Sequence, residues 1–331
     1  MTALRLRSIL WLAALAAVTA VVLLAMGCGS GSSSPSSSPS SSAAAASSAV
    51  VIDGASITAD AGLNAMLPAS ILSRGYLKVA SALPYEPWEY FDPPTSKNPA
   101  GFDYDLSQAI GAKLGIKASF INTPFDTIIL SVTGAKNDMI MADMYDNADR
   151  EKVLTFVDYA YDGTSILVLT GNPDGLTNLD SLSGKPVAVL SGSSQQALLE
   201  NVNKTFKSSG KAEMTILALP GTPDGLLAIK GGRAVALVTD HSQAEAVAKS
   251  TGGGNVFEVI SDPAAPNGYE PAIVGIGIAK SNTPLVTAVQ KALQALIDEG
   301  SYKTIVDKYG LSPVESALTN QAAVVSASPS P

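Results

Sequence analysis

The sequence predicts an α/β fold of two domains, from the length of its foldable segment and from the order of its apolar patterns. Residues 70–316 are too many for one small domain and suit two. Within them, short apolar runs alternate with segments whose apolar residues recur every three or four positions. Strands that alternate with helices are typical of α/β folds with parallel or mixed sheets. No repeat of solenoid period is present in the sequence.

The individual elements follow from local signals along this segment. Apolar residues at four-residue spacing predict a helix over 104–114. Pro284 in a first turn and Gly300 after a last turn predict a helix between them. Gly310 ends a shorter predicted helix over 302–309. We also predict a helix that opens at 192–194, and strands over 77–80, 138–142, 187–190, 234–238 and 273–279.

The composition excludes several classes of protein. The 331-residue chain has a formal net charge of −8 and only 15% charged residues. Its pI near 4.7 argues against a nucleic-acid partner, which would need a basic surface. One cysteine excludes a disulfide framework and a multi-thiolate zinc site, and one histidine excludes a His-rich metal centre. We therefore expect neither a metal site nor a cofactor.

The amino end has the layout of an export signal, expected over residues 1–27. Arg5 and Arg7 form a short positive region, and an apolar stretch follows them. The small residues before Cys28 resemble a bacterial lipobox, in which the cysteine becomes the first mature residue and carries lipid. The alternative is an uncleaved membrane anchor, because residues 8–27 are 20 uncharged residues and could span a bilayer.

A serine-rich stretch separates this signal from the foldable segment. Twelve of the twenty residues from 30 to 49 are serine, so the stretch has little to bury and stays solvated. We expect a flexible tether over residues 28–69 and a disordered tail over 317–331. Both alternatives for the amino end place the folded part outside the cytoplasm and fasten it to a membrane.

Residues 101–106, Gly-Phe-Asp-Tyr-Asp-Leu, are the most diagnostic of a series of motifs that occur in a fixed order. The chain resembles the solute-binding proteins of ABC importers, in particular the polar amino-acid-binding family, solute-binding family 3. The other motifs lie at 76–80, 84–90, 122–126, 150–153, 156–159, 180–187, 296–302 and 308–310. The resemblance implies a type 2 periplasmic-binding-protein fold of two α/β lobes, joined by two crossing strands, with a ligand cleft between them. Lobe 1 would hold residues 70–166 and 271–316, and lobe 2 residues 167–270.

The resemblance also implies which residues bind the charges of an amino acid, both of which are costly to bury unpaired. Arg150 stands where the family binds the ligand carboxylate, a role suited to a bidentate guanidinium. Ser193 and Ser194 stand at a strand-to-helix turn, where they either donate to the ligand or only cap the helix. Asp240 stands where the family binds the ammonium; capping the next helix is the alternative.

The expected side-chain part of the cleft is less well defined. Tyr85 stands where the family has a stacking aromatic. Asp143 stands in a stretch where many relatives have serine or glycine, and an extra acid in a dry cleft would favour a cationic ligand. Against this, Ala82 stands where some relatives with basic ligands carry an acid. The other expected lining residues are Trp88 and Phe125, which could equally be core, and Ala142 and Tyr145.

These expectations describe a substrate-binding lipoprotein of an ABC importer, which has no catalysis of its own and closes by a hinge over a polar amino acid. A cationic side chain on that ligand is left open. The expected partners are the amino acid, an importer permease and the membrane, with the protein itself a monomer. Two alternatives remain: a cyclohexadienyl dehydratase on the same fold, with Asp143 as the unusual acid, and a sensory lipoprotein that presents its ligand to a membrane receptor.

Overall fold

The computed structural model of the chain describes residues 49–322. The predicted export signal, Cys28 and the tether up to residue 48 lie outside the described residues, as do residues 323–331 of the predicted tail. Among residues 49–322, no helix combines the length and the apolar character needed to cross a membrane.

The helices and strands alternate along most of the chain. The helices are α1 (Ala61–Asn64), α2 (Ala69–Arg74), α3 (Phe102–Lys113), α4 (Phe125–Thr133), α5 (Ser194–Ser208), α6 (Thr222–Lys230), α7 (His241–Ser250), α8 (Thr283–Asp298) and α9 (Ser301–Tyr309), with 3-10 helices η1 (Arg150–Lys152), η2 (Leu179–Leu182) and η3 (Thr251–Gly253). The strands are β1 (Val50–Ile52), β2 (Ala55–Ile57), β3 (Tyr76–Ser81), β4 (Tyr90–Phe91), β5 (Pro99–Ala100), β6 (Lys117–Asn122), β7 (Met139–Ile140), β8 (Leu154–Leu169), β9 (Pro186–Leu190), β10 (Thr215–Leu219), β11 (Ala236–Asp240), β12 (Phe257–Val259), β13 (Tyr269–Ala279) and β14 (Ser312–Pro313).

The predicted elements are all present, with shifted ends. The predicted helices correspond to α3, α5, α8 and α9, and the predicted strands to β3, β7, β9, β11 and β13. Helix α8 follows Asn282 and has Pro284 in its first turn, as its sequence signals indicate. Strand β7 is shorter than predicted, because only Met139 and Ile140 pair with β3 and β13.

The structure differs from the expectation over the end of the predicted tether. Residues 50–69 form β1, β2 and α1 instead of a flexible chain. Ile57, Leu63 and Leu67 are buried in the same core as α3 and α8. At the other end, Ala317 is also buried in that core. The physical reason is that burying these apolar side chains against the core of lobe 1 removes apolar surface from water, which is favourable.

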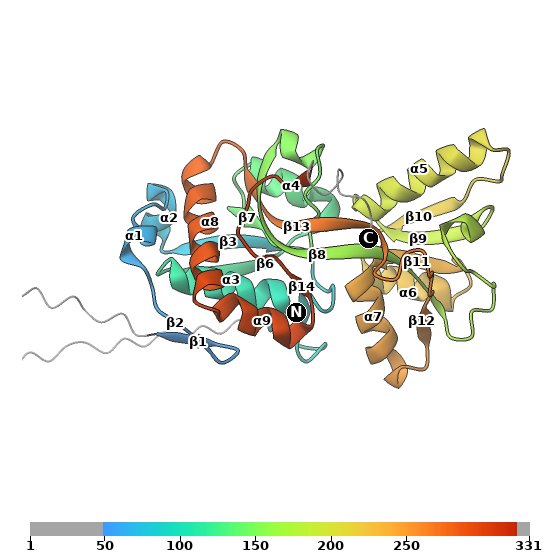
Figure 1. Cartoon of the computed structure of the whole chain (residues 1–331), viewed down its shortest axis with the longest axis horizontal. Helices are drawn as coiled ribbons and strands as arrows, with labels where there is room; N and C mark the ends of the chain where they lie inside the picture. Colours follow the sequence, from blue (N-terminus) through green and yellow to red (C-terminus); the bar gives the residue numbers. More distant parts are fainter. Residues whose placement is uncertain (1–48, 323–331) are drawn as a thin grey trace, which may run out of the picture. The chain divides into compact units, whose positions relative to one another are not determined.

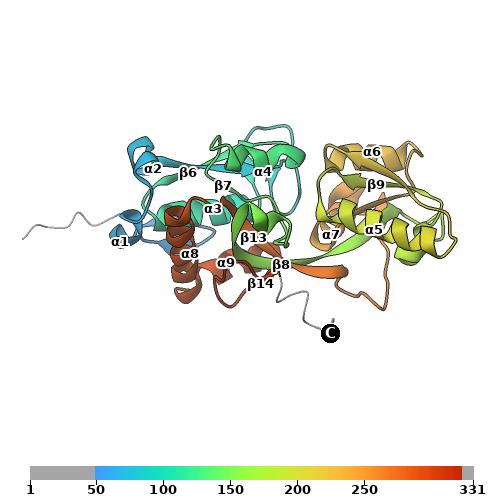
Figure 2. The same ribbon diagram turned by 90° about the horizontal axis from the view of Figure 1, so that it is seen from above.

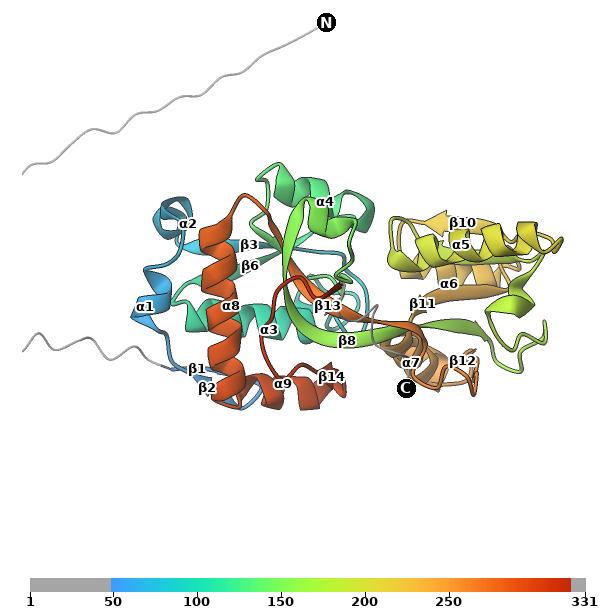
Figure 3. The same ribbon diagram turned by 45° about the horizontal axis from the view of Figure 1, so that its top comes forward.

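One mixed sheet of ten strands runs through the described residues. The order along its main path is β10-β9-β11-β8-β13-β7-β3-β6, with β12 and β14 paired to β8. The antiparallel strands β8 and β13 are long, at 16 and 11 residues. They lie side by side and run from one group of helices to the other (Figures 1 and 3).

The buried side chains divide this arrangement into two lobes. Along β8, Ala160 belongs to the core of lobe 1, while Ile166 belongs to the core of lobe 2. Along β13, Tyr269 packs against the core of lobe 2 and Ile273 belongs to that of lobe 1. The chain therefore crosses between the lobes twice, within these two intervals. The lobe boundaries that the sequence suggested, after residues 166 and 270, stay predictions.

In each lobe, helices cover both faces of the sheet because side chains alternate between the faces of a strand. In lobe 2, Val187 packs with Leu199 of α5, while the next residue, Ala188, packs with Ala228 of α6 on the other face. Figure 2 shows β9 between these two helices. In lobe 1, α4 covers one face, and α3, α8 and α9 cover the other.

Candidate functional site

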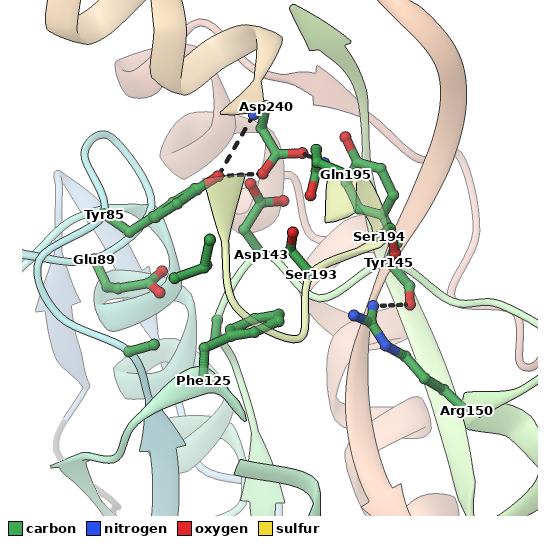
Figure 4. A pocket seen from close by; sticks show the side chains of 13 residues that line it. Tyr85, Glu89, Phe125, Asp143, Tyr145, Arg150, Ser193, Ser194, Gln195 and Asp240 are labelled. Atoms are coloured by element: carbon green, nitrogen blue, oxygen red, sulfur yellow. Dashed lines mark hydrogen bonds between the residues drawn. The ribbon is translucent and has the colours of Figure 1, made fainter. Parts of the chain in front are cut away.

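A pocket lies between the lobes, where four strands of the sheet end. Its walls include Ala82 after β3 and Asp143 after β7 in lobe 1, and the last residues of β9 and β11 in lobe 2. Ligands of open α/β sheets bind at the carboxyl ends of the strands. The lining residues are Ala82, Tyr85, Glu89, Phe125, Ala142, Asp143, Tyr145, Arg150, Leu190, Ser193, Ser194, Gln195 and Asp240 (Figure 4).

Nine of the ten ligand-binding residues suggested by the sequence line this pocket. Trp88 does not, because its side chain is fully buried in the core of lobe 1, edge-on to Phe102 and Tyr159. Trp88 is therefore a core residue and not part of the pocket wall. Its indole N–H nevertheless crosses to lobe 2, where it donates to Ser242 Oγ at 2.7 Å.

The pocket is nearly filled by its own side chains. Its free volume is about 10 Å³, close to the least that one water molecule needs, ~10–15 Å³. A second cavity of about 270 Å³ adjoins it and shares the walls formed by Ala82, Tyr85, Phe125 and Leu190. The pocket as described is therefore too small for an amino acid, and binding needs a movement of the lobes or of the lining side chains.

Arg150 reaches the pocket from η1, beside the ring of Phe125. Its backbone N–H donates to Asn147 Oδ1 at 2.9 Å, and its guanidinium donates to the carbonyls of Tyr145 at 2.8 Å and Gly192 at 3.3 Å. Burial lowers the pKa of Arg150 to about 10, so the side chain stays charged at neutral pH. A guanidinium has five N–H donors, so these bonds leave donors for a bidentate contact with a carboxylate.

The start of α5 faces the same pocket from lobe 2. Gly192, at a φ of 79°, allows the sharp turn between β9 and the helix. Ser193 is the N-cap residue, and its Oγ accepts from the Gln196 N–H at 3.1 Å. Ser194 and Gln195 follow, and the first N–H groups of a helix have no partner within it. This helix start can therefore donate to an anion in the pocket.

Asp240 stands at the end of β11 and directs its carboxylate into the pocket rather than onto α7. Asp240 is the N-cap residue of α7 by position, but its side chain makes no capping hydrogen bond to that helix. Oδ1 accepts from Gln195 Nε2 at 2.6 Å, and Oδ2 accepts from the Tyr85 hydroxyl of lobe 1. Burial and the nearby charge of Asp162 raise the pKa of Asp240 to about 7.

Asp143 and Tyr145 form the wall of lobe 1 near Asp240. Tyr145 donates its hydroxyl hydrogen bond to the Gly163 carbonyl at 3.1 Å. Asp143 is buried, and neither of its carboxylate oxygens has a hydrogen-bond partner among the described residues. Burial, with the charge of Asp240 adding to it, raises the pKa of Asp143 well above its usual range.

Glu89 is a lining residue that the sequence analysis missed. It is only 1% exposed, and its Oε2 has no hydrogen-bond partner among the described residues. Its backbone pairs with Tyr85 across a tight turn, where the Glu89 N–H donates to the Tyr85 carbonyl at 3.0 Å. Burial raises the pKa of Glu89 well above its usual range, and the charge of Asp103 adds to this rise. The motif at 84–90 contains Glu89, but only the turn shows that its side chain faces inward.

Carboxyl groups outnumber positive charges in this pocket. Glu89, Asp143 and Asp240 line it, and Arg150 is the one cationic residue among the lining residues. Within residues 49–322, Asp143, Asp240 and Asp162 each bring one carboxylate oxygen within 4.8 Å of the others. A positively charged ligand group could pair with these carboxyl groups.

Comparison with known proteins gives a family match over most of the chain. The model of the family described as "Bacterial extracellular solute-binding proteins, family 3" matches residues 77–312. A curated relative, "Putative ABC transporter arginine-binding protein 2" of Escherichia coli (strain K12), is 25% identical over 233 residues, which are 70% of this chain and 90% of that protein.

Two solved structures extend the similarity to the fold. "An ancestral arginine-binding protein bound to arginine" is 30% identical, with a TM-score of 0.63, over 71% of this chain and 98% of that one. "The ancestral amino acid-binding protein AncCDT-1, a precursor of cyclohexadienyl dehydratase" is 27% identical, with a TM-score of 0.60, over 72% of this chain and 97% of that one. Both resemble this chain across both lobes.

Proposed function

Because the chain belongs to family 3 of the bacterial extracellular solute-binding proteins, we propose that it binds an L-amino acid with a cationic side chain for an ABC importer. The observation that carries this proposal is that Arg150 of lobe 1 and Asp240 of lobe 2 line one pocket together with the buried acid Glu89. The relatives described as arginine-binding proteins support the same ligand class.

The charged ends of the amino acid fit opposite sides of the pocket. The carboxylate would take the remaining donors of Arg150 and the N–H groups at the start of α5, around Ser193 and Ser194. The ammonium would bind Asp240 and displace the Tyr85 hydroxyl from Oδ2, while Gln195 keeps Oδ1. Each ligand charge then meets a buried partner of opposite sign, which offsets the cost of its desolvation.

The side chain of the ligand would run between Tyr85 and Phe125 toward Glu89. Both rings line the pocket, and aromatic faces attract a cation. The unpartnered Oε2 of Glu89 supplies a carboxylate close to Ala82, whose backbone N–H lowers the pKa of Glu89. Glu89 could thereby supply the acid that some relatives with basic ligands carry at the position of Ala82.

Hinge closure follows from the placement of these groups on different lobes. A ligand that touches Arg150 and Asp240 at once favours the closed arrangement by its differential affinity for it. In the described structure, the lobes are already joined by Tyr85 to Asp240 and by Arg150 to the Gly192 carbonyl. The ligand would replace the Tyr85 contact to Asp240 with its own ammonium and leave Arg150 bonded to the Gly192 carbonyl.

A calorimetric screen of the standard amino acids and ornithine against the full-length chain tests this proposal. We expect arginine, lysine or ornithine to bind at least about tenfold more tightly than neutral amino acids, and to raise the melting temperature by mass action. Binding to none of these compounds would sink the proposed function. A clear preference for a neutral amino acid would contradict the cationic side chain of the ligand and leave amino-acid binding intact.

The enzyme alternative receives less support than binding. AncCDT-1 is itself described as an amino acid-binding protein, although a precursor of a dehydratase, and the pairing of Arg150 with Asp240 suits a bound amino acid. Turnover of prephenate or arogenate by the purified chain would reverse this preference. For the amino end, we propose removal of residues 1–27, lipid attachment at Cys28 and a monomer held near the membrane, on the sequence pattern alone.

A further inference from the structure

Asp143 is the one lining acid that the proposed function leaves without a task. We propose that Asp143 of lobe 1 and Asp240 of lobe 2 bind the α-ammonium of the ligand together, so that a primary ammonium on the ligand favours closure. This inference rests on the proposed function, because it takes the ligand to be an amino acid bound between the lobes. It assigns Asp143 to the ammonium and not to the side chain of the ligand.

The backbone holds Asp143 in a fixed position. Its N–H donates to Asp103 Oδ2 at 2.9 Å, and Asp103 is in turn held by the Tyr159 hydroxyl at 2.6 Å. Asp143 has a φ of 42°, a left-handed conformation that is uncommon for a residue with a side chain. The fixed backbone directs the carboxylate into the pocket, next to that of Asp240 (Figure 4).

The free acceptors of Asp143 point to a ligand. The residue is 5% exposed, and neither carboxylate oxygen has a partner among the described residues. Buried polar atoms nearly always have hydrogen bonds, and a buried carboxylate without a partner is costly. Asp240 differs, since both its oxygens already accept from Gln195 and Tyr85.

The spacing of the two carboxylates suits an ammonium group. One oxygen of Asp143 and one of Asp240 lie within 4.8 Å of each other. An ammonium has three N–H donors, and at ~2.8 Å from each acceptor its tetrahedral directions span oxygens about 4.6 Å apart. One primary ammonium can therefore donate to both residues at once.

Like charges on opposite lobes make this ammonium favour closure. Two ionised carboxylates this close, in a buried site, repel each other strongly unless a cation or a proton lies between them. Arg150 does not take this place, because its guanidinium donates to the Tyr145 and Gly192 carbonyls and makes no hydrogen bond to Asp143 or Asp240 among the described residues. The other acids near Asp143 are Glu89, Asp103 and Asp162, so they add negative charge and do not relieve it.

Asp162 lies next to Asp143 and Asp240 but outside the pocket. It does not line the pocket, although one of its oxygens belongs to the same close group. Its carboxylate accepts from the Gly163 N–H at 2.7 Å and from the Ser242 hydroxyl at 2.5 Å. Because Asp162 does not line the pocket, the ammonium is left to Asp143 and Asp240.

Calorimetry with two probes tests the assignment in the full-length chain. The probes are L-arginine and 5-guanidinopentanoate, which is arginine without its α-amino group. We expect the wild-type chain to prefer L-arginine by about 1,000-fold, because a site with buried acceptors rejects an analogue that leaves them unpaired. Asp143→Asn should cut this ratio at least tenfold, and Asp143→Ser should do the same. A ratio that both variants leave within twofold of wild type would overturn the proposal.

Glu89→Gln is the matched control, since it removes a lining carboxylate at the other end of the ligand. It should weaken both probes by the same factor and leave their ratio unchanged. If it lowers the ratio as much as Asp143→Asn does, the effect is one of general pocket charge and the proposal is wrong. A calcium-dependent rise in melting temperature that Asp143→Asn abolishes would also overturn it, because the cluster would then bind a metal ion.

Lobe separation without ligand gives a second readout that needs no arginine binding. Leu130 on α4 of lobe 1 and Leu227 on α6 of lobe 2 are 71% and 63% exposed, so Leu130→Cys and Leu227→Cys can carry spin labels in a Cys28→Ser chain. At pH 8 and without ligand, Asp143→Asn should increase the closed population relative to the labelled chain that keeps Asp143. Equal populations would overturn the pairing. If the populations differ but the wild type binds no arginine, the proposed cationic ligand is wrong, while the repulsion between Asp143 and Asp240 is supported.

Discussion

The indole N–H of Trp88 in lobe 1 donates a 2.7 Å hydrogen bond to the hydroxyl of Ser242 in lobe 2. The Ser242 hydroxyl donates in turn to Asp162 Oδ2 at 2.5 Å. These three residues are not among those that line the pocket. The contact therefore joins the two lobes outside the pocket, where it stabilises the closed arrangement without lining the ligand site.

Ser242→Ala should weaken binding through this contact. A hydrogen bond contributes about 0.5–1.5 kcal/mol, and its loss would reduce the closed population, so we expect affinity to fall by about two- to tenfold. Titration calorimetry measures the change, and the emission of Trp88 in a Trp11→Phe chain reports its surroundings directly. Ser73→Ala, on the exposed side of α2, is the control. Unchanged affinity in Ser242→Ala would mean that the contact does not contribute to closure.

Arg150→Ala should abolish binding and leave the fold intact. The guanidinium is the cationic group in the pocket, so its loss leaves the ligand carboxylate without its main partner, and we expect affinity to fall at least about 100-fold. Far-UV circular dichroism checks that the fold is intact, and calorimetry measures the loss of affinity. Arg74→Ala, which breaks an ion pair with Asp138 outside the pocket, should leave affinity unchanged. If Arg150→Ala binds within a few-fold of wild type, the carboxylate is held elsewhere.

Glu89→Gln should separate cationic ligands from neutral ones. Removing a buried carboxylate that faces the distal end of the ligand should weaken arginine by about 10- to 100-fold, while citrulline, its neutral analogue, changes less than about threefold. Competition between the two ligands for each variant measures this difference. Glu86→Gln, in the same turn but only half-buried, is the control. An equal loss of affinity for arginine and for citrulline would show that Glu89 stabilises the turn and does not interact with the ligand charge.

The stability of the fold should fall as the pH rises from 4 to 8. Asp158, fully buried on β8, has no partner for either carboxylate oxygen among the described residues, and its burial raises its pKa to about 8. Burial likewise raises the pKa of Asp146, which holds the Gln321 N–H at 2.7 Å, to about 7. In the unfolded chain these groups ionise near pH 4, so between pH 4 and 8 the native state binds more protons and stability decreases with pH.

Urea unfolding at pH 5 and pH 8.5 measures this slope, since a tenfold difference in acid dissociation between the folded and unfolded chains corresponds to about 1.4 kcal/mol. Asp158→Asn should flatten the dependence, with a gain of about 2 kcal/mol or more at pH 8.5 and little change at pH 5. Asp307→Asn, at an exposed ion pair on α9, should leave the slope as it is. A wild-type chain that is more stable at pH 8.5 than at pH 5 would contradict the assignment.

Local signals predicted the helices and strands with the clearest patterns. Pro284 and Gly300 bracket α8 because proline and glycine restrict or relax the backbone of single residues, whatever lies around them. The residues of β1 and β2 show no such signal. Ile57 becomes a core residue only because α3 and α9 offer it an apolar surface, and this surface arises from residues that are distant in sequence.

The sequence by itself determined the α/β architecture, the family, and the presence of Arg150, Ser193 and Asp240 at the ends of elements, since motifs and periodicity are properties of neighbouring residues. Only the tertiary structure decided which side chains share the pocket. It brought Glu89 and Gln195 into the wall and left Trp88 in the core of lobe 1. It also set the carboxylate of Asp143 against that of Asp240, 97 positions later. The physical reason is that the long strands β8 and β13 carry the chain between the lobes. The ends of β7 and β11 then face the same pocket, although they are far apart in the sequence.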